Sequence, residues 1–450
     1  MNMKEHLLTD EEIRIARHCL SYCLSLGAAQ VRVTLNKSLM NLTGLLNGEV
    51  DKVSHALDRS LQLAIFADGR YGTFSSNRLE ITELEAFIRE AVDTVRMLEP
   101  DSLRGLPDPS REVQVATTGL ELGLYDPEYE KLDSEARRSM ALNSCFWPRR
   151  AELGFKLVSE EGEYSDSVYD MLILDSNSLE ARHTETSFEL GYESTVEDAE
   201  GRRYSAYWWE ASSSLKDFKP EGCARKAALR AAAQMNPQDI APGKYNLIVD
   251  SENASKLVSP LISALGGSAL QLRNSFLEGT LEQRVFSENF TLWDKPCTYA
   301  ACGSRLFDSE GVATADAPVI EKGVVKRYFL NSYFARKMQM EPTVEDVSRL
   351  WMKPVGGLES LDELLERVGD GILVTGFNGG NSNPATGNFS YGVEGFLVSG
   401  GKIVHPVREA LVTGDFIGLW NKLIATADDA RPCMSRLIPS LAFKNVDFSA

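Results

Sequence analysis

The chain has 450 residues, more than one hydrophobic core usually serves, so two domains are expected. Hydrophobic residues make up 43% of it, which is enough for packed interiors and excludes a disordered protein. The formal net charge of -18 disfavours nucleic acid as a partner, because a DNA-binding face must neutralise phosphates.

The N-terminal sequence, MNMKEHLLTDEEIRIARHCL, is polar and charged before it turns amphipathic, and it lacks the apolar centre of a secretory signal. No later segment is apolar over the length needed to span a bilayer, so no membrane contact is expected. Seven cysteines without paired spacing resemble reduced thiols. These observations together predict a cytoplasmic protein.

Two Thr-x-x-Glu sequences in the first quarter of the chain have the spacing of a capping box. Thr9–Glu12 predicts a helix over about residues 10–26, and Thr82–Glu85 precedes a second apolar stripe of helical period. Residues 29–76 between them are predicted to form a sheet. Its expected hairpin turns are Asn47-Gly48 and Asp68-Gly69.

The middle of the chain is predicted to be a connector over 99–111, a helix from near Asp133 or Ser134, and an antiparallel meander over about 154–213. The expected meander turns are Glu161-Gly162, Asp175-Ser176-Asn177 and Ala199-Glu200-Gly201. We place the domain boundary before residue 217, because Pro220 suits the first position of a new helix. The predicted domains are therefore 1–216 and 217–450.

A helix is expected after the strand NLIVD, with Asp250 or Ser251 as its cap and Glu252 near its positive N-terminus. Further on, residues 308–311 crowd acceptor side chains and a glycine into one tight turn. Glu321-Lys322-Gly323 then divides two short apolar runs as a hairpin turn would, and a short helix follows. The element order predicts an α+β fold of two domains, each with mixed or antiparallel sheets and packed helices.

The segment from Phe307 to Lys337, FDSEGVATADAPVIEKGVVKRYFLNSYFARK, resembles the TldD/PmbA family, also called TldD/TldE and modulator of DNA gyrase. The likeness continues from Asp217 to Pro296 and from Gly387 to Asp429, and more weakly from Ala28 to Ser76. It therefore covers most of the chain, and the order of these segments makes it specific.

In the metal-bearing TldD branch, the resemblance would place a His-Glu-x-x-x-His motif at the start of the helix after NLIVD. There two imidazoles hold zinc and the carboxylate can activate water. The corresponding positions here are Ser251, Glu252 and Lys256, and a protonated ammonium cannot ligate zinc. The chain is thus closest to the PmbA/TldE branch, and we expect no catalytic residue, no metal and no cofactor in it.

Two alternatives stay open. Dispersed ligands could make the chain a self-sufficient metallopeptidase, with His183 and Glu185, or His405 and Glu409, meeting Cys433, although surface or core roles are favoured for these residues. The chain could also be a regulatory binding protein of the gyrase-modulator type, because acidic proteins can mimic nucleic acid.

The predicted substrate-binding residues lie in two places. Residues 375–387 are expected to be a loop in which Asn378, Gly379, Gly380 and Asn381 could bind peptide, with a plain connection between strands as the alternative. Asp308 and Glu310 are expected to be architectural, with contact to substrate or partner as a further role. The aromatic stretch over 204–209 is expected to be core or interface, with a partner surface as the second interpretation.

The resemblance implies a function. The chain would be a PmbA/TldE-like subunit of a cytosolic TldD/TldE-type zinc metalloprotease complex that acts on unfolded or extended peptides. The zinc would belong to a TldD-like partner subunit, and a homodimer is the alternative assembly.

Overall fold

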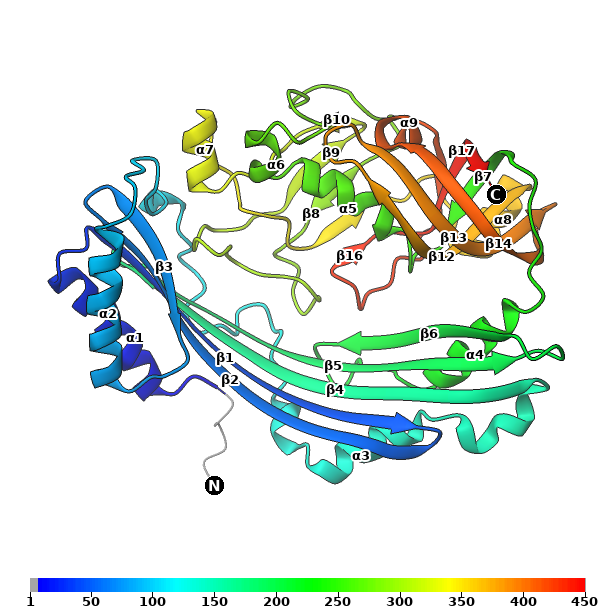
Figure 1. Ribbon diagram of the computed structural model, residues 1–450, viewed down its shortest axis with the longest axis horizontal. Helices are drawn as coiled ribbons and strands as arrows, with labels where there is room; N and C mark the ends of the chain where they lie inside the picture. The colour runs from blue at the N-terminus through cyan, green and yellow to red at the C-terminus, as the bar shows by residue number, and fades with distance from the viewer. Residues whose placement is uncertain (1–6, 450) are drawn as a thin grey trace.

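The computed structural model describes residues 7–449 and has an α+β fold. A long curved sheet from the first half of the chain lies along one side, and the second half lies over its inner face (Figure 1). Paired helices cover the outer face at one end of this sheet. Among the described helices, none is long and apolar enough to cross a membrane.

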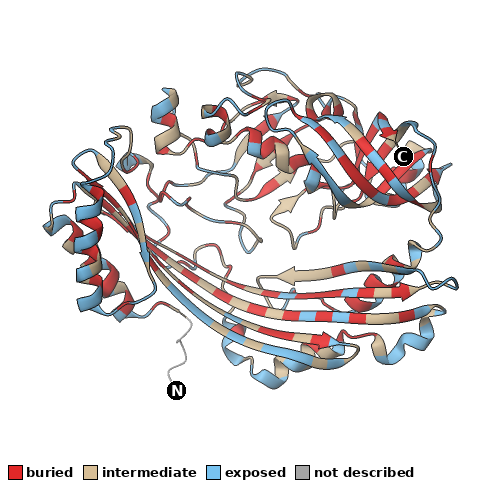
Figure 2. Cartoon of the chain, viewed as in Figure 1, coloured by how far each residue is buried: buried red, intermediate tan, exposed pale blue. Residues whose placement is uncertain are grey.

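The first sheet is antiparallel throughout, with the strand order β3-β2-β1-β4-β5-β6. Its strands are β1 (Gln30–Leu46), β2 (Glu49–Ala67), β3 (Arg70–Ser76), β4 (Lys156–Asp175), β5 (Glu180–Glu197) and β6 (Arg203–Ser212). Buried and less buried residues alternate along them, as expected of strands with two different faces (Figure 2).

The predicted turns of this sheet are confirmed except for one. Asn47-Gly48 and Asp68-Gly69 join β1, β2 and β3, and all four residues have the positive φ that a two-residue hairpin turn requires. The prediction of a turn at Glu161-Gly162 is wrong, because Gly162 lies inside β4 and pairs with β1 and β5. A Cβ at Gly162 would lie 2.3 Å from the Tyr192 ring, so this glycine makes room for an aromatic side chain.

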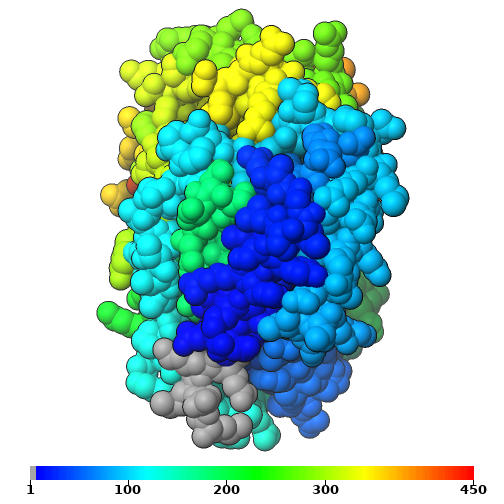
Figure 3. Space-filling view, turned by 90° about the vertical axis from the view of Figure 1, so that its left-hand side faces the viewer, coloured from blue at the N-terminus to red at the C-terminus, as the bar shows by residue number. Residues whose placement is uncertain are grey.

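The outer face of the first sheet carries α1 (Asp10–Ser25) and α2 (Ile81–Val95), which Figure 3 shows side by side at one end of the molecule. The capping box at Thr9 is confirmed: Thr9 Oγ1 accepts from the Glu12 N–H at 3.2 Å, and Glu12 Oε2 accepts from the Thr9 N–H at 2.8 Å. The prediction of a second capping box at Thr82 is wrong. Helix α2 begins at Ile81, so Thr82 lies in its first turn and Glu80 is the cap residue.

Further short helices follow α2 before β4, and one more lies between β6 and β7. They are η1 (Pro109–Arg111), η2 (Pro127–Lys131), α3 (Ser134–Asn143), η3 (Trp147–Leu153) and α4 (Cys223–Ala233). Asp133 caps α3 as predicted, since its Oδ1 accepts from the Ala136 N–H at 2.8 Å. Pro220 is not at a first helical position, because α4 begins after Gly222, whose φ of 88° ends the preceding turn. The domain boundary before residue 217 stays a prediction.

The second half contains two mixed sheets. One has the order β14-β13-β12-β7-β17-β15, and a further pairing of β14 with β17 closes it on itself. The other has the order β10-β9-β8-β11-β16. The strands are β7 (Gly243–Val249), β8 (Leu292–Asp294), β9 (Ala317–Glu321), β10 (Val324–Val325), β11 (Leu350–Met352), β12 (Gly371–Ser382), β13 (Asn388–Ser399), β14 (Lys402–Asp415), β15 (Leu423–Thr426), β16 (Arg436–Leu437) and β17 (Leu441–Ser449).

Helices fill the space beside these sheets and bury a largely aliphatic core. They are α5 (Ser255–Ala264), α6 (Gly267–Gln271), α7 (Ser332–Met338), α8 (Leu361–Val368) and α9 (Phe416–Trp420). Trp420 is fully buried and stacks on Phe290 with 3.9 Å between ring centroids. The hairpin turn at Lys322-Gly323 is confirmed, with φ of 46° and 78°.

Two expectations for the second half are wrong. Residues 375–382 belong to β12, and only 383–387 connect β12 to β13. Register shifts between Val374 and Gly376 and between Phe377 and Gly379 keep this glycine-rich run paired with β13. Helix α5 begins at Ser255, three or four residues later than expected, because Asp250 caps the turn before it by accepting from the Asn253 N–H at 3.1 Å.

The two Thr-x-x-Glu sequences provide a matched test of the helix starts. We expect Thr9→Ala to lower the free energy of unfolding by about 1 kcal/mol, because it leaves an N-terminal N–H of α1 without its acceptor. Thr82→Ala should change it by less than about 0.5 kcal/mol. Urea denaturation of both variants measures this, and equal losses would contradict the assigned cap positions.

Candidate functional site

A cavity of about 690 Å³ lies where the first sheet meets the second half of the chain. Strand β6 and helix α4 form one side of this junction cavity, and the segment after β7 forms the other together with α8, β12 and β13. Its polar lining includes Lys226, Arg230, Asp250, Glu252 and Asn253. The junction cavity therefore contains the glutamate of the degenerate metal motif.

Arg431 connects the two sides of the junction cavity. Its guanidinium pairs with Glu252 after β7 and with Glu210 on β6, the latter at 3.3 Å, and it donates to the Trp209 carbonyl. The Arg431 and Glu252 side chains are only 10% and 14% exposed. The carbon Cζ of Arg431 lies 4.2 Å from the ring centroid of Trp208, within cation–π range.

The other two positions of the degenerate motif do not line the junction cavity. The Ser251 N–H donates to Ser440 Oγ at 3.0 Å, and Lys256 is exposed with its Nζ 5.2 Å from the ring centroid of Tyr391. A hydroxyl, an ammonium and a carboxylate already neutralised by arginine do not form a zinc donor set. Throughout residues 7–449, no group of three or more His, Cys, Asp or Glu side chains is arranged to hold a metal ion.

Three cationic side chains lie close to the indole ring of Trp208. Besides Arg431, Lys226 Nζ lies 3.3 Å and Arg230 Cζ 5.2 Å from its ring centroid. Burial lowers the pKa of Lys226, and the positive charges of Arg431 and Arg230 lower it further. Arg230 is 3.4 Å from Asp250, whose own pKa is raised by burial.

The dispersed metal ligands are only partly brought together. Glu185 and Cys433 both line a second cavity, of about 590 Å³, between β5, β6 and the second half. His183 is nearly buried and contacts Glu185 through Nε2 at 3.2 Å. His405 lies on β14, where its Nδ1 is 3.0 Å from the Pro406 carbonyl oxygen, and it does not line that cavity. Burial raises the pKa of Cys433, which disfavours the thiolate that a metal needs.

Asp308 and Glu310 are buried and hold the turn that the sequence predicted. Asp308 Oδ1 accepts from the N–H groups of Glu310 and Val312 at 2.9 and 3.0 Å, and its Oδ2 accepts from Glu345 N–H at 3.0 Å. Glu310 Oε2 accepts from the Ser332 N–H at 2.7 Å, at the start of α7. Both carboxylates therefore satisfy backbone donors, and their contact with substrate or partner stays a prediction.

The predicted peptide-binding asparagines and glycines lie near the C-terminal end of β12. Asn378, Gly379, Gly380 and Asn381 are exposed, and Asn378 Nδ2 donates to Glu394 Oε1 at 3.2 Å. None of these four residues lines the junction cavity, although Glu394 does. Their substrate role stays a prediction.

Sequence reasoning missed the residues that organise the junction cavity. Arg431, Glu210, Lys226 and Arg230 carry no motif, and they meet only because β6 and α4 fold against the second half. The available signals were the aromatic pair Trp208-Trp209 and the position of Arg431 two residues before Cys433. Neither signal reveals which acid the arginine contacts.

Models of the PmbA/TldA metallopeptidase central and C-terminal domains match residues 129–235 and 242–450. The chain belongs to the PmbA/TldD family. Within this family, a Bacteroides thetaiotaomicron protein named a putative modulator of DNA gyrase is 40% identical and superimposes with a TM-score of 0.93. That comparison covers 98% of this chain and 99% of the other.

Two further relatives carry the names of the family's branches. A protein from Escherichia coli named metalloprotease PmbA is 24% identical over 453 residues, covering 98% of each chain. TldE from Thermococcus kodakarensis shares the fold, with a TM-score of 0.84 at 18% identity over 97% of this chain and 100% of that one. The resemblance of the sequence to the PmbA/TldD family is thus confirmed.

Removing the Arg431 guanidinium should be costly, because it leaves Glu252 buried without a counter-charge. We expect Arg431→Met to lower the free energy of unfolding by about 3 kcal/mol. Arg408→Met is the matched control, because Arg408 pairs with Asp239 at the surface. This variant should lower the free energy of unfolding by less than about 1 kcal/mol. Similar losses in the two variants, measured by denaturation, would contradict the role assigned to Arg431.

Asp308 should make stability fall as pH rises. Burial raises the pKa of this carboxyl to about 6, above its unfolded value of about 3.9, so the folded state binds the proton more tightly. Its stabilising contribution is fully present below about pH 4 and is lost as pH rises through about 6. When the pH rises from 4 to 7.5, the free energy of unfolding of the wild type should fall by about 2 kcal/mol more than that of Asp308→Asn. Denaturation of both proteins across this pH range measures the difference. A pH-independent difference between the two proteins would contradict this.

Proposed function

We propose that this chain is the PmbA/TldE-like subunit of a TldD/TldE-type metalloprotease complex, and that it helps to enclose an extended peptide while a TldD-like partner holds the zinc. The observation that carries the proposal is the arginine at the degenerate motif: Arg431 neutralises Glu252, the motif's remaining carboxylate. A guanidinium donates hydrogen bonds and offers no lone pair to a metal. The family's metal chemistry is therefore assigned to another subunit.

The junction supports a role in holding peptide. Strand β6 is the last strand of the first sheet, and on its other side no strand pairs with it among the described residues. It borders both the junction cavity and the cavity that contains Cys433. An extended peptide can add to such an edge through backbone hydrogen bonds, which bind many sequences with little selectivity.

The zinc that the family implies would supply an activated water, and no step of that chemistry is assigned to residues of this chain. What these residues would contribute is a wall that binds and orients the substrate. The cytoplasm is the proposed compartment, and a homodimer is the alternative assembly.

Co-expression with a protein that carries the His-Glu-x-x-x-His motif tests the proposal. We expect the two chains to co-purify, with stoichiometric zinc in the partner and none in this chain, and the complex to cleave an unfolded peptide. Glutamine in place of the partner's motif glutamate should abolish cleavage, whereas Glu252→Gln in this chain should leave it largely intact. Stoichiometric zinc in the isolated chain, or loss of cleavage with Glu252→Gln at unchanged complex yield, would contradict the proposal.

A further inference from the structure

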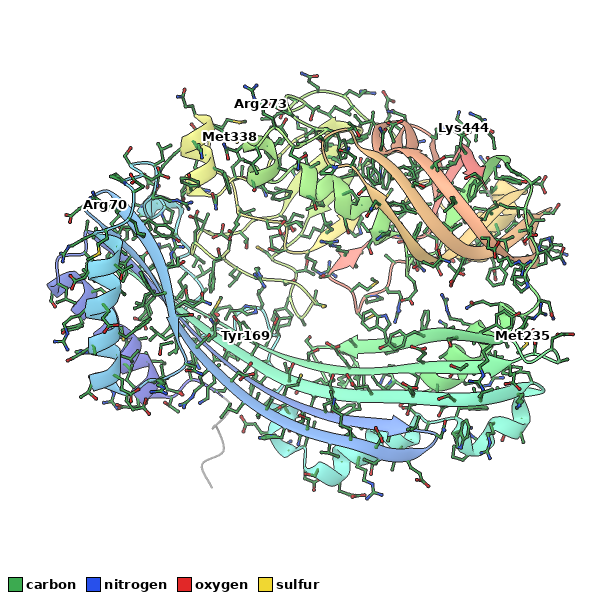
Figure 4. All side chains as sticks on the ribbon, in the orientation of Figure 1. Arg70, Tyr169, Met235, Arg273, Met338 and Lys444 are labelled. Carbon is green, nitrogen blue, oxygen red and sulfur yellow. The ribbon has the colours of Figure 1, made fainter. Side chains whose placement is uncertain are left out.

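A third cavity, of about 570 Å³, lies on the inner face of the first sheet, beside the turn over 308–311. Figure 4 labels Tyr169, which lines this inner-face cavity, on the side of the sheet that faces the second half. The lining includes the polar side chains of Thr34, Asn36, Gln62 and Thr73 from β1, β2 and β3. The inner-face cavity is separate from the degenerate motif, since Ser251, Glu252 and Lys256 do not line it.

Arg32 points into this cavity with hydrogen-bonding capacity to spare. It lies on β1 between Val31 and Val33, which are buried against the helices on the opposite face. One terminal nitrogen donates to the Ser309 carbonyl at 3.2 Å, while the Nε atom is buried and has no hydrogen-bond partner among the described residues. The second terminal nitrogen forms no hydrogen bond within residues 7–449, so it can donate to an acceptor on a ligand.

Arg305 is the second cation of the inner-face cavity. Its side chain is exposed, and it forms no hydrogen bond or ion pair within residues 7–449. Glu185 lies in the neighbouring cavity that Arg305 also lines, but Glu185 is hydrogen-bonded to His183. The guanidinium is therefore available to a ligand.

Acidic side chains compete little for these two arginines. Asp308 is the acidic residue among those that line the cavity, and its carboxylate already accepts three backbone N–H groups. Two further carboxylates, Glu112 near Arg32 and Glu185 near Arg305, interact with these arginines electrostatically but form no ion pair with them in the part of the chain that the structure describes.

We propose that the inner-face cavity binds a carboxylate carried by a peptide, with Arg32 and Arg305 as its donors. Guanidinium groups match carboxylate oxygens in geometry, and the charge assists the hydrogen bonds. The neutral side chains Asn36, Gln62 and Thr73 offer donors and acceptors to the adjoining peptide backbone. This inference rests on the proposed function in taking the ligand to be a peptide, and it adds a preference for acidic ones.

Three decapeptides of otherwise identical sequence test the inference with the full-length chain. One has a central glutamate and an amidated C-terminus, the second a central glutamine and a free C-terminal carboxylate, and the third a central glutamine and an amidated C-terminus. Titration calorimetry should show that at least one of the first two peptides binds about tenfold more tightly than the third. The third peptide has neither carboxylate, so it cannot form the charge-assisted contact with the arginines. Which of the two binds more tightly identifies the source of the carboxylate.

Arg305→Met and Arg32→Met should each reduce this preference to about twofold or less. Arg305→Met is the cleaner variant, because Arg32 also contacts Ser309. Arg89→Met, an exposed arginine on α2 at the outer face, is the matched control and should keep the full preference.

Equal binding of all three peptides, or an unchanged preference in both cavity variants, would overturn the inference and leave the proposed function intact. Absence of binding by every peptide, to the chain alone and to its complex with the metal-bearing partner, would contradict both.

Discussion

The ion pair between Arg431 and Glu252 is the constraint on which the junction depends. Arg431 comes from the C-terminal segment, Glu252 follows β7, and Glu210 and Trp209 belong to β6, so one guanidinium joins three distant parts of the chain. Both partners are nearly buried, and Glu252 would lose its counter-charge without Arg431, whereas Arg431 also pairs with Glu210. The same contact that joins the two halves beside the junction cavity therefore neutralises a carboxylate that lines it.

The ion pair also decides whether Glu252 is free to take part in metal chemistry. A carboxylate at this position can assist a metal-bound water only if it is free, whereas here it is committed to an arginine. The chain keeps the overall fold of a family member, the Bacteroides thetaiotaomicron protein, with which it superimposes over 98% of its length. In this chain the segment after β7 carries Ser251, Glu252 and Lys256, and the carboxylate among them is paired with Arg431.

Local signals in the sequence predicted much of the fold. The hairpins at Asn47-Gly48 and Lys322-Gly323 and the cap at Thr9 depend only on neighbouring residues, and all three are confirmed. Errors arose where tertiary packing decides. Gly162 resembles a turn residue but clears space for Tyr192 across the sheet, and the glycines of β12 stay paired through register shifts. The partners of Arg431 and Arg32 could not be predicted, because long-range folding alone brings them together.

The central claim is that the metal of the complex is not held by this chain. Anomalous scattering at the zinc absorption edge, recorded from crystals of the chain with a TldD-like partner, tests it most directly. The account predicts a strong peak at the partner's histidines and none beside Glu252, where the Arg431 guanidinium should be visible instead. A peak within bonding distance of Glu252, with Arg431 displaced, would contradict it.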